Sequence, residues 1–283
     1  MSQPLCVLAF SGGLDTSFCV LHLRERGFDV ATVTVNTGGF DAAEIARIEA
    51  AAHRLGVVQH RTIDARQELW DDYLRYLLYG NVLRGQLYPL SVSAERVCQA
   101  KRVAEVANEL DAAAIAHGST GAGNDQVRFD VAFRALCPDK QLITPIRELA
   151  LSREDETRWL AERGVVIPPK TTLYSVNEGM WGTSVGGKET HDSWQHLPES
   201  AYPGGVIAAD LPPRTLVLGF ERGNPITLDG AAVGAVAIVE ALNRLGDQYG
   251  IGRGIHLGDT ILGIKGRVGF SAPAAHLLIQ AHR

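Results

Sequence analysis

The stretch FSGGLDTS, residues 10–17, decides the fold of the first half of this chain. It follows the apolar run LCVLAF (5–10), which predicts a buried strand, and it opens a helical segment over 14–26 that Gly27 ends. A strand, two glycines and a helix N-terminus in succession direct backbone N–H groups and the positive helix end at one point. This arrangement predicts a phosphate-binding loop, although the Walker pattern GxxxxGK[ST] is absent.

The loop contains an aspartate, Asp15, and no lysine. One interpretation is that Asp15 holds Mg²⁺ through water, so that the metal supplies the positive charge that a lysine would bring. The other is that its carboxylate caps amides of its own loop, with Ser11 or Asp15 as the N-cap of the helix. Both remain open from the residues alone.

Strands and helices alternate along the first half, which predicts an α/β fold with a parallel sheet and right-handed crossovers. Ligands of such sheets bind beyond the carboxyl ends of the strands, where FSGGLDTS and the segment 117–129 both lie. Further strands are expected at 29–35, 57–64, 112–118 and 141–145, and further helices at 42–56, 66–79 and 93–110.

The composition changes near residue 165, where Gly, Pro, Ser and Thr become frequent. We therefore predict a nucleotide-binding domain over 1–168 and an α+β substrate domain over 169–283. In the second domain RTLVLGFERGNPITL (214–228) predicts a hairpin with its turn at Gly223–Asn224, followed by a helix over 231–245. The end of the chain, AAHLLIQAHR, predicts a helix without a stop signal.

The overall composition is that of a soluble globular enzyme, with 46% hydrophobic and 21% charged residues in 283 and a formal net charge of −5. No Lys/Arg run indicates a nucleic-acid surface, and no segment indicates a membrane span or a signal peptide. The cysteines predict buried reduced thiols, which suits the cytoplasm. They are Cys6, Cys19, Cys98 and Cys137.

The segment HGSTGAGNDQVRF, residues 117–129, carries a second set of chemical groups. Its glycines let successive amides converge on an anion. Asn124 and Asp125 can orient an amine and a carboxylate, and Arg128, one helical turn past Asn124, offers a bidentate fork to a carboxylate. The cluster favours a zwitterionic amino acid; a glycine-rich loop with a structural Arg ion pair is the alternative.

These two motifs, with YPLSVSAER and the pair GIGR and GIKGR, resemble the argininosuccinate synthase family of the PP-loop ATP pyrophosphatases over nearly the whole chain. The resemblance implies a two-step ligation in which citrulline attacks the α-phosphorus of MgATP and expels pyrophosphate. The amine of aspartate then displaces AMP from the citrullyl-adenylate and forms argininosuccinate. ATP and Mg²⁺ are the implied cofactors, and the implied partners are small molecules, without nucleic acid or membrane.

The resemblance also implies roles for individual residues, of which Asp15, Asp125 and Arg128 would be catalytic. The implied ATP site consists of Ala9, Phe10, Ser11, Gly12, Gly13, Leu14, Asp15, Thr16, Ser17, Val35 and Gly118, with Asp15 as a possible Mg²⁺ ligand through water. Citrulline would contact Tyr88, Ser93, Arg128, Ser175, Ser184 and Asp259, and aspartate would contact Thr120, Asn124 and Asp125. Tyr88 equally suits a packed aromatic, and the loops of Ser175 and Ser184 suit either role.

The chain departs from the commoner family pattern in three places. Val92 replaces a Thr before Ser93. Gly258 and Asp259 lie near the Glu and Asn of the usual Glu-Asn-Arg run, and Phe270 lies at a Tyr. Losing that carboxylate and hydroxyl suits an N-acylated citrulline, whereas Asp259 can restore one carboxylate and keep free citrulline, which we favour.

Family members continue beyond the position of Arg283 into a segment used for subunit association. The resemblance therefore implies a homo-oligomer in the full-length form and a chain that lacks this segment. Two alternatives remain. A PP-loop tRNA-thiolating enzyme would need paired cysteines and a basic face, and a catalytically silent truncated paralogue would act as a binding subunit.

Overall fold

The computed structural model describes residues 3–121, 123–167, 174–260 and 263–283, with the side chains of 259–260 and 264–265 left out. The chain folds into two compact units. Unit 1 comprises Met1–Asn36, Phe40–Ala65 and Arg96–Thr171, and unit 2 comprises Thr37–Gly39, Arg66–Glu95 and Thr172–Arg283.

Unit 1 is built on a five-stranded sheet of order β3-β2-β1-β4-β5 in which every neighbouring pair is parallel. This confirms the predicted α/β class. Residue 8 of β1 pairs with residue 32 of β2 and with residue 116 of β4. The strands are β1 (Leu5–Ala9), β2 (Asp29–Asn36), β3 (Gln59–Asp64), β4 (Ala114–Ala116) and β5 (Gln141–Ile143).

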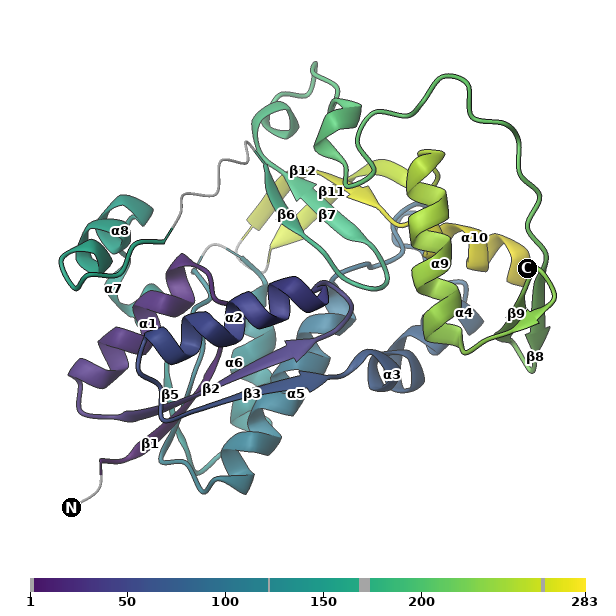
Figure 1. Ribbon diagram of the computed structural model, residues 1–283. Helices are drawn as coiled ribbons and strands as arrows, with labels where there is room; N and C mark the ends of the chain where they lie inside the picture. Colours follow the sequence, from purple (N-terminus) through teal and green to yellow (C-terminus); the bar gives the residue numbers. More distant parts are fainter. Residues whose placement is uncertain (1–2, 122, 168–173, 261–262) are drawn as a thin grey trace. The chain divides into compact units, whose positions relative to one another are not determined.

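Helices cover both faces of this sheet (Figure 1), with α1 and α2 on one side and α5 and α6 on the other. Alternate residues of β1 point to opposite faces of the sheet, so each face has a buried core. Cys6 and Leu8 belong to the hydrophobic cluster with α1 and α2, whereas the buried Val7 points to the other face. The helices are α1 (Leu14–Glu25), α2 (Ala42–Arg54), α5 (Ser93–Glu109), α6 (Asp125–Leu136), α7 (Pro145–Leu149) and α8 (Arg153–Ala161).

Helix α8 packs along α1 with the same chain direction. Arg153 lies next to Asp15 at the N-terminal ends, the rings of Phe18 and Trp159 are 4.7 Å apart, and Arg163 bonds Glu25 near the C-terminal ends. The two helix N-termini therefore lie together at the phosphate loop.

The described residues of unit 2 form two antiparallel sheets. The four-stranded sheet has the order β11-β12-β7-β6, and the three-stranded sheet has the order β10-β9-β8. The strands are β6 (Ser175–Asn177), β7 (Thr183–Gly186), β8 (Leu218–Glu221), β9 (Asn224–Leu228), β10 (Ala231–Ala232), β11 (Arg253–Thr260) and β12 (Gly263–Ser271).

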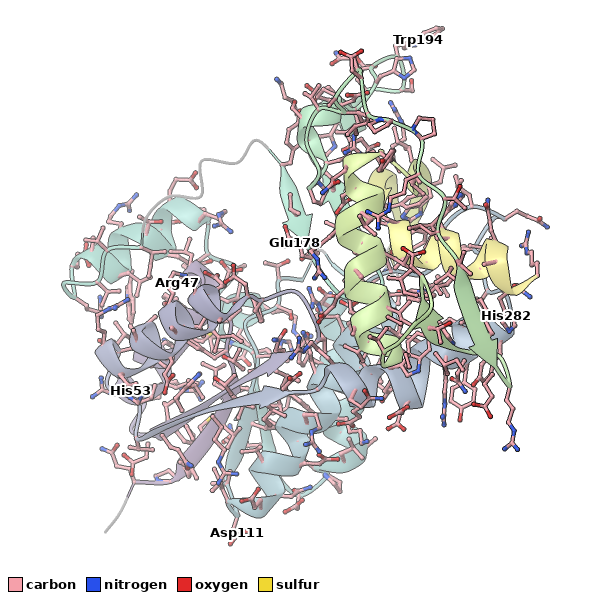
Figure 2. All side chains as sticks on the ribbon, turned by 45° about the vertical axis from the view of Figure 1, so that its right-hand side comes forward. Arg47, His53, Asp111, Glu178, Trp194 and His282 are labelled. Atoms are coloured by element: carbon pink, nitrogen blue, oxygen red, sulfur yellow. The ribbon has the colours of Figure 1, made fainter. Side chains whose placement is uncertain are left out.

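The helices of unit 2 come from the two longer of the three chain segments that form it. They are α3 (Arg66–Leu69), the π-helical turn η1 (Trp70–Leu74), α4 (Arg75–Tyr79), α9 (Ala235–Gln248) and α10 (Pro273–His282), with the 3₁₀ turns η2 (Lys188–His191) and η3 (Glu199–Ala201). Trp181 is fully buried and its ring lies 6.3 Å from that of Trp70. Trp194, by contrast, points into solvent (Figure 2).

Three predicted elements differ in detail. The helix predicted over 66–79 consists of three segments with the wider π turn in the middle. In the hairpin Glu221 pairs with Asn224, so the two loop residues are Arg222 and Gly223 rather than Gly223 and Asn224. Both have positive φ, as the type I′ turn requires. The helix predicted to begin at 231 begins at Ala235 instead, because a short strand precedes it.

The predicted boundary between 168 and 169 lies outside the described residues and stays a prediction. All four cysteines are buried and free, as expected. None of the helices in the described ranges has the length and apolar character that a bilayer span requires.

Candidate nucleotide and amino-acid site

The strand order places a switch point at β1, because β2 lies on one side of it and β4 on the other. In open α/β sheets the loops after such strands diverge and leave a crevice at their carboxyl ends. The loop after β1 is FSGGLDTS, and the loop after β4 leads into residues 117–124. Both predicted motifs therefore belong to the same edge of the sheet in unit 1.

The phosphate loop turns at Gly12, which has a φ of +66°. Its N-cap is Gly13, which replaces the expected Ser11 or Asp15, and the first helical bond runs from the Ser17 N–H to the Gly13 carbonyl. The amides that precede Ser17 in α1 therefore have no acceptor within the helix, which suits an anion. The Thr16 Oγ1 donates to the Gly13 carbonyl at 3.3 Å and lies 3.4 Å from Ser11 Oγ.

Gly118 packs directly against this loop. A Cβ atom there would lie 3.3 Å from Thr16 Cγ2 and 3.4 Å from Cys19 Sγ, a closer approach than most side chains tolerate. The absence of a side chain thus lets the β4 loop touch the start of α1. Val35 is buried in β2, and its carbonyl accepts a 3.4 Å hydrogen bond from Gln99 Nε2 on α5.

Two arginines from other helices reach the phosphate loop. Arg47, which projects from α2 (Figure 2), donates from Nη1 to the Gly12 carbonyl at 3.3 Å and forms a two-bond ion pair with Glu44. Arg153 Nη1 lies 3.5 Å from Asp15 Oδ1. Positive charge at this lysine-free loop therefore comes from residues far away in the sequence, and neither arginine was predicted.

Glu156 lies beside Asp15 and was also not predicted. It is 2% exposed, and burial and the neighbouring Asp15 carboxylate raise the pKa of Glu156 to about 7. A carboxyl group in such a place favours a bound proton or a nearby cation.

The second motif is organised around His117, which is 1% exposed. Its Nδ1 accepts the Ser119 N–H at 3.1 Å, so Nε2 carries the proton that it donates to Asp130 at 2.8 Å. Arg147 donates to the other Asp130 oxygen at 3.0 Å and to Gln126, whose amide donates to the Gly121 carbonyl. Burial lowers the pKa of His117, which keeps the ring neutral.

This network fixes the backbone on both sides of the expected aspartate contacts. Thr120 is exposed in the loop, and Asn124 is the N-cap of α6. Because Arg128 N–H donates to the Asn124 carbonyl at 3.2 Å, Arg128 lies one helical turn on, as predicted.

Asp125 is held between two arginines. Arg128 Nη1 lies 2.6 Å from Oδ1, and Arg96 Nε lies 3.1 Å from Oδ2. Burial alone would raise the pKa of Asp125, but the Arg96 and Arg128 guanidiniums hold it below its usual value. Arg96 also donates to Gln99 Oε1 at 3.0 Å. Arg96 ends the segment YPLSVSAER, and its place one helical turn after Ser93 is the signal in the sequence that could have indicated it.

The other expected citrulline contacts belong to unit 2. Ser184 of β7 pairs with Asn177 of β6, which puts Ser175 and Ser184 on one face of that sheet. Phe270 pairs with Ser184 and shares this face.

Tyr88 is 6% exposed and packs among aromatic rings. Its ring stacks on His256 with 3.9 Å between centroids and meets the edge of Phe270 at 5.2 Å, while its hydroxyl accepts from Ser91 Oγ at 3.0 Å. The packed-aromatic interpretation of Tyr88 is therefore compatible with the structure, and His256 is a neighbour that the sequence did not indicate.

Two expected citrulline contacts remain to be placed. Ser93 is the first residue of α5. Asp259 lies in β11 by its backbone, and its side chain lies outside the described part of the structure.

The parallel sheet, the glycine loop after β1 and the loop after β4 together define a nucleotide-binding α/β domain followed by a second domain. Residues 5–166 match the family model described as "Arginosuccinate synthase N-terminal HUP domain", and residues 174–283 match "Arginosuccinate synthase C-terminal domain". The chain belongs to the argininosuccinate synthase family, an enzyme family of ligases.

Curated relatives agree with this assignment. The argininosuccinate synthase of Xanthomonas campestris pv. campestris is 41% identical over 100% of this chain and 72% of its own. The enzyme of that name from Xylella fastidiosa is 40% identical over 100% of this chain and 71% of its own. That of Dictyoglomus turgidum is 39% identical, again over 100% and 71%.

Proposed function

We propose that this chain joins citrulline and aspartate to form argininosuccinate, with ATP cleaved to AMP and pyrophosphate. The family assignment supports the ligation and the use of ATP. The observation that carries the proposal is the pair of loops at the switch point of unit 1, one suited to phosphate and one to an amino acid. Two such loops at one sheet edge are what an adenylating ligase of amino acids needs.

In the first step the ureido oxygen of citrulline attacks the α-phosphorus and the bond to the β-phosphate breaks. The proposed ATP site runs from Ala9 to Ser17 and includes Val35 and Gly118; within it, the backbone N–H groups and hydroxyls of the glycine loop hold the phosphates. In the second step the aspartate amine displaces AMP from the citrullyl-adenylate. Catalysis then consists of positioning and charge stabilisation, with no side-chain nucleophile.

Each of the two amino-acid substrates is proposed to bind particular side chains of the chain. Asp125, aligned by its two arginines, and Asn124 are proposed to orient the amine of aspartate, with Thr120 as a further contact. Arg128 is proposed to bind the citrulline carboxylate, with its guanidinium already fixed by Asp125. Tyr88, Ser93, Ser175, Ser184 and Asp259 are proposed as the remaining citrulline contacts.

The residues at the phosphate loop suit Mg²⁺. Asp15 offers a carboxylate, and the Ser17 Oγ is buried without a hydrogen-bond partner among the described residues. Hard oxygen donors of this kind are those that Mg²⁺ prefers. The described residues contain no cluster of three or more His, Cys, Asp or Glu that could hold a metal, so substrate phosphates would have to complete the shell. Mg²⁺ would supply charge neutralisation of the phosphates, and Asp15 would orient it through water.

The experiment is pyrophosphate release by the purified full chain. We expect release to require ATP, Mg²⁺ and citrulline, and argininosuccinate to appear only when aspartate is added. Asp125→Asn should abolish argininosuccinate formation, whereas Asp139→Asn, at an exposed site, serves as the control. Absence of any citrulline-dependent release would instead favour the silent binding subunit. A cytoplasmic homo-oligomer stays a prediction, which sedimentation of the purified protein and fractionation of cells would test.

A further inference from the structure

Glu156 is a buried acidic residue beside the phosphate loop. It lies in the first turn of α8, is 2% exposed, and its Oε2 has no hydrogen-bond partner among the described residues. A buried carboxylate oxygen without a partner is costly, so a proton or a cation is expected next to it.

The neighbour that Glu156 faces is Asp15. Arg153, on the same side of α8, contacts Asp15, and the Asp15 carboxylate raises the pKa of Glu156, so the two carboxyl groups lie near each other where α8 packs along α1. Two carboxylates at one point repel each other unless positive charge lies between them. The structure therefore contains a carboxyl pair beside the phosphate loop, where the first turns of α1 and α8 meet.

Arg153 brings a positive charge next to Asp15. Its Nη1 lies 3.5 Å from Asp15 Oδ1, and it lies three residues before Glu156, on the same side of α8. Its side chain is 66% exposed, so the ion pair is weak and screened by solvent. Among the described residues, this exposed guanidinium contacts the carboxyl pair at Asp15, so a further positive charge, or a proton on Glu156, would stabilise the pair.

Building on the function proposed above, we propose that Asp15 and Glu156 together form the protein's half of the Mg²⁺ site of MgATP, and that Arg153 occupies this place until the metal arrives. Mg²⁺ in nucleotide enzymes is usually held by one or two carboxylates plus substrate phosphates, which is the set available here. When the metal binds, Arg153 is released from Asp15 and is free to pair with a phosphate.

The competing explanation is that a proton, rather than a metal, satisfies Glu156. Glutamine imitates protonated glutamate in shape and hydrogen bonding but is a much poorer ligand for Mg²⁺. Glu156→Gln therefore separates the two explanations. Glu154→Gln, at an exposed residue of the same helix, is the matched control.

The test measures metal binding rather than turnover. Mg²⁺ is titrated calorimetrically into the full chain, alone and with α,β-methylene-ATP, which cannot be cleaved between the α- and β-phosphates. We expect Glu156→Gln and Asp15→Asn each to weaken Mg²⁺ binding at least about tenfold, in line with the effect of losing groups that support a metal site. Nucleotide binding in EDTA should change by less than about twofold, and Glu154→Gln should match the parent.

Arg153→Gln provides the second arm. With the competing guanidinium gone, Mg²⁺ alone should bind several-fold more tightly. Parental Mg²⁺ affinity in Glu156→Gln would overturn the proposal and leave a protonated Glu156. If Glu156→Gln does not fold, unchanged Mg²⁺ affinity in Arg153→Gln would overturn it in the same way. Because the titration measures binding and requires no catalytic turnover, it is independent of the proposed function. A protein that binds Mg²⁺ through Glu156 but forms no argininosuccinate would refute only that function.

Discussion

Arg96 offers the sharpest test of how unit 1 positions its amino-acid site. Its Nε lies 3.1 Å from Asp125 Oδ2, and Arg128 binds the other oxygen at 2.6 Å. Each carboxylate oxygen of Asp125 therefore has its own arginine, and Arg96→Gln removes one of the two. The remaining ion pair with Arg128 can rotate about a single contact. Asp125 therefore keeps its negative charge but loses its fixed orientation.

The expected magnitude follows from burial. A hydrogen bond to a charged group contributes about 1.5–3 kcal/mol when it is shielded from solvent. The Arg96 side chain is 16% exposed and Asp125 is 36% exposed, so solvent screening lowers this to about 1–2 kcal/mol. Each 1.4 kcal/mol is about tenfold in an equilibrium or rate ratio. We therefore expect kcat/KM for aspartate to fall about 5- to 30-fold.

The assay is steady-state kinetics with each substrate varied in turn. For a positioning residue, the KM for aspartate should rise and the KM for ATP should change by less than about twofold. Arg96→Lys, which keeps the charge but not the planar fork, should recover part of the loss. Arg102→Gln, on the same helix and paired with Glu105, is the control. A parental KM for aspartate in a folded Arg96→Gln protein would refute the reasoning.

Three further predictions concern other parts of the chain. Burial lowers the pKa of His117, so below pH ~6.5 the unfolded chain binds a proton that the folded chain does not. The free energy of unfolding should therefore decrease as the pH is lowered through this range, and urea titrations should find a smaller decrease in His117→Gln. All four cysteines are buried, and burial raises the pKa of Cys6 to about 12. Native protein should therefore not react with a disulfide reagent at pH 7, whereas four thiols should react in urea. Rapid labelling of the native form would contradict this. Citrulline should be turned over faster than N-acetylcitrulline, and Asp259→Ala should lower that preference; a parent that prefers the acylated substrate would show that the ammonium of citrulline has no carboxylate partner.

The sequence by itself determined the strands of unit 1, its helices α1, α2 and α5, and the places of its two loops. Hydrophobic periodicity and glycine punctuation act over a few residues, so the β1–loop–α1 unit and the alternation of strands and helices could be predicted from neighbours in the chain. The same locality explains the errors. A period of 3.6 residues over 66–79 does not reveal a π turn, and Gly-Asn signals a hairpin without fixing which two residues form its loop.

Only the tertiary structure decided which charges meet at the site. Arg96 and Asp125 are 29 residues apart, and Arg153 and Glu156 reach Asp15 only because α8 packs along α1. Tyr88 and His256 stack although no local pattern relates them. Propensity and periodicity describe how a segment folds, whereas the pKa of a carboxyl group and the place of a guanidinium depend on which distant segment packing brings beside it.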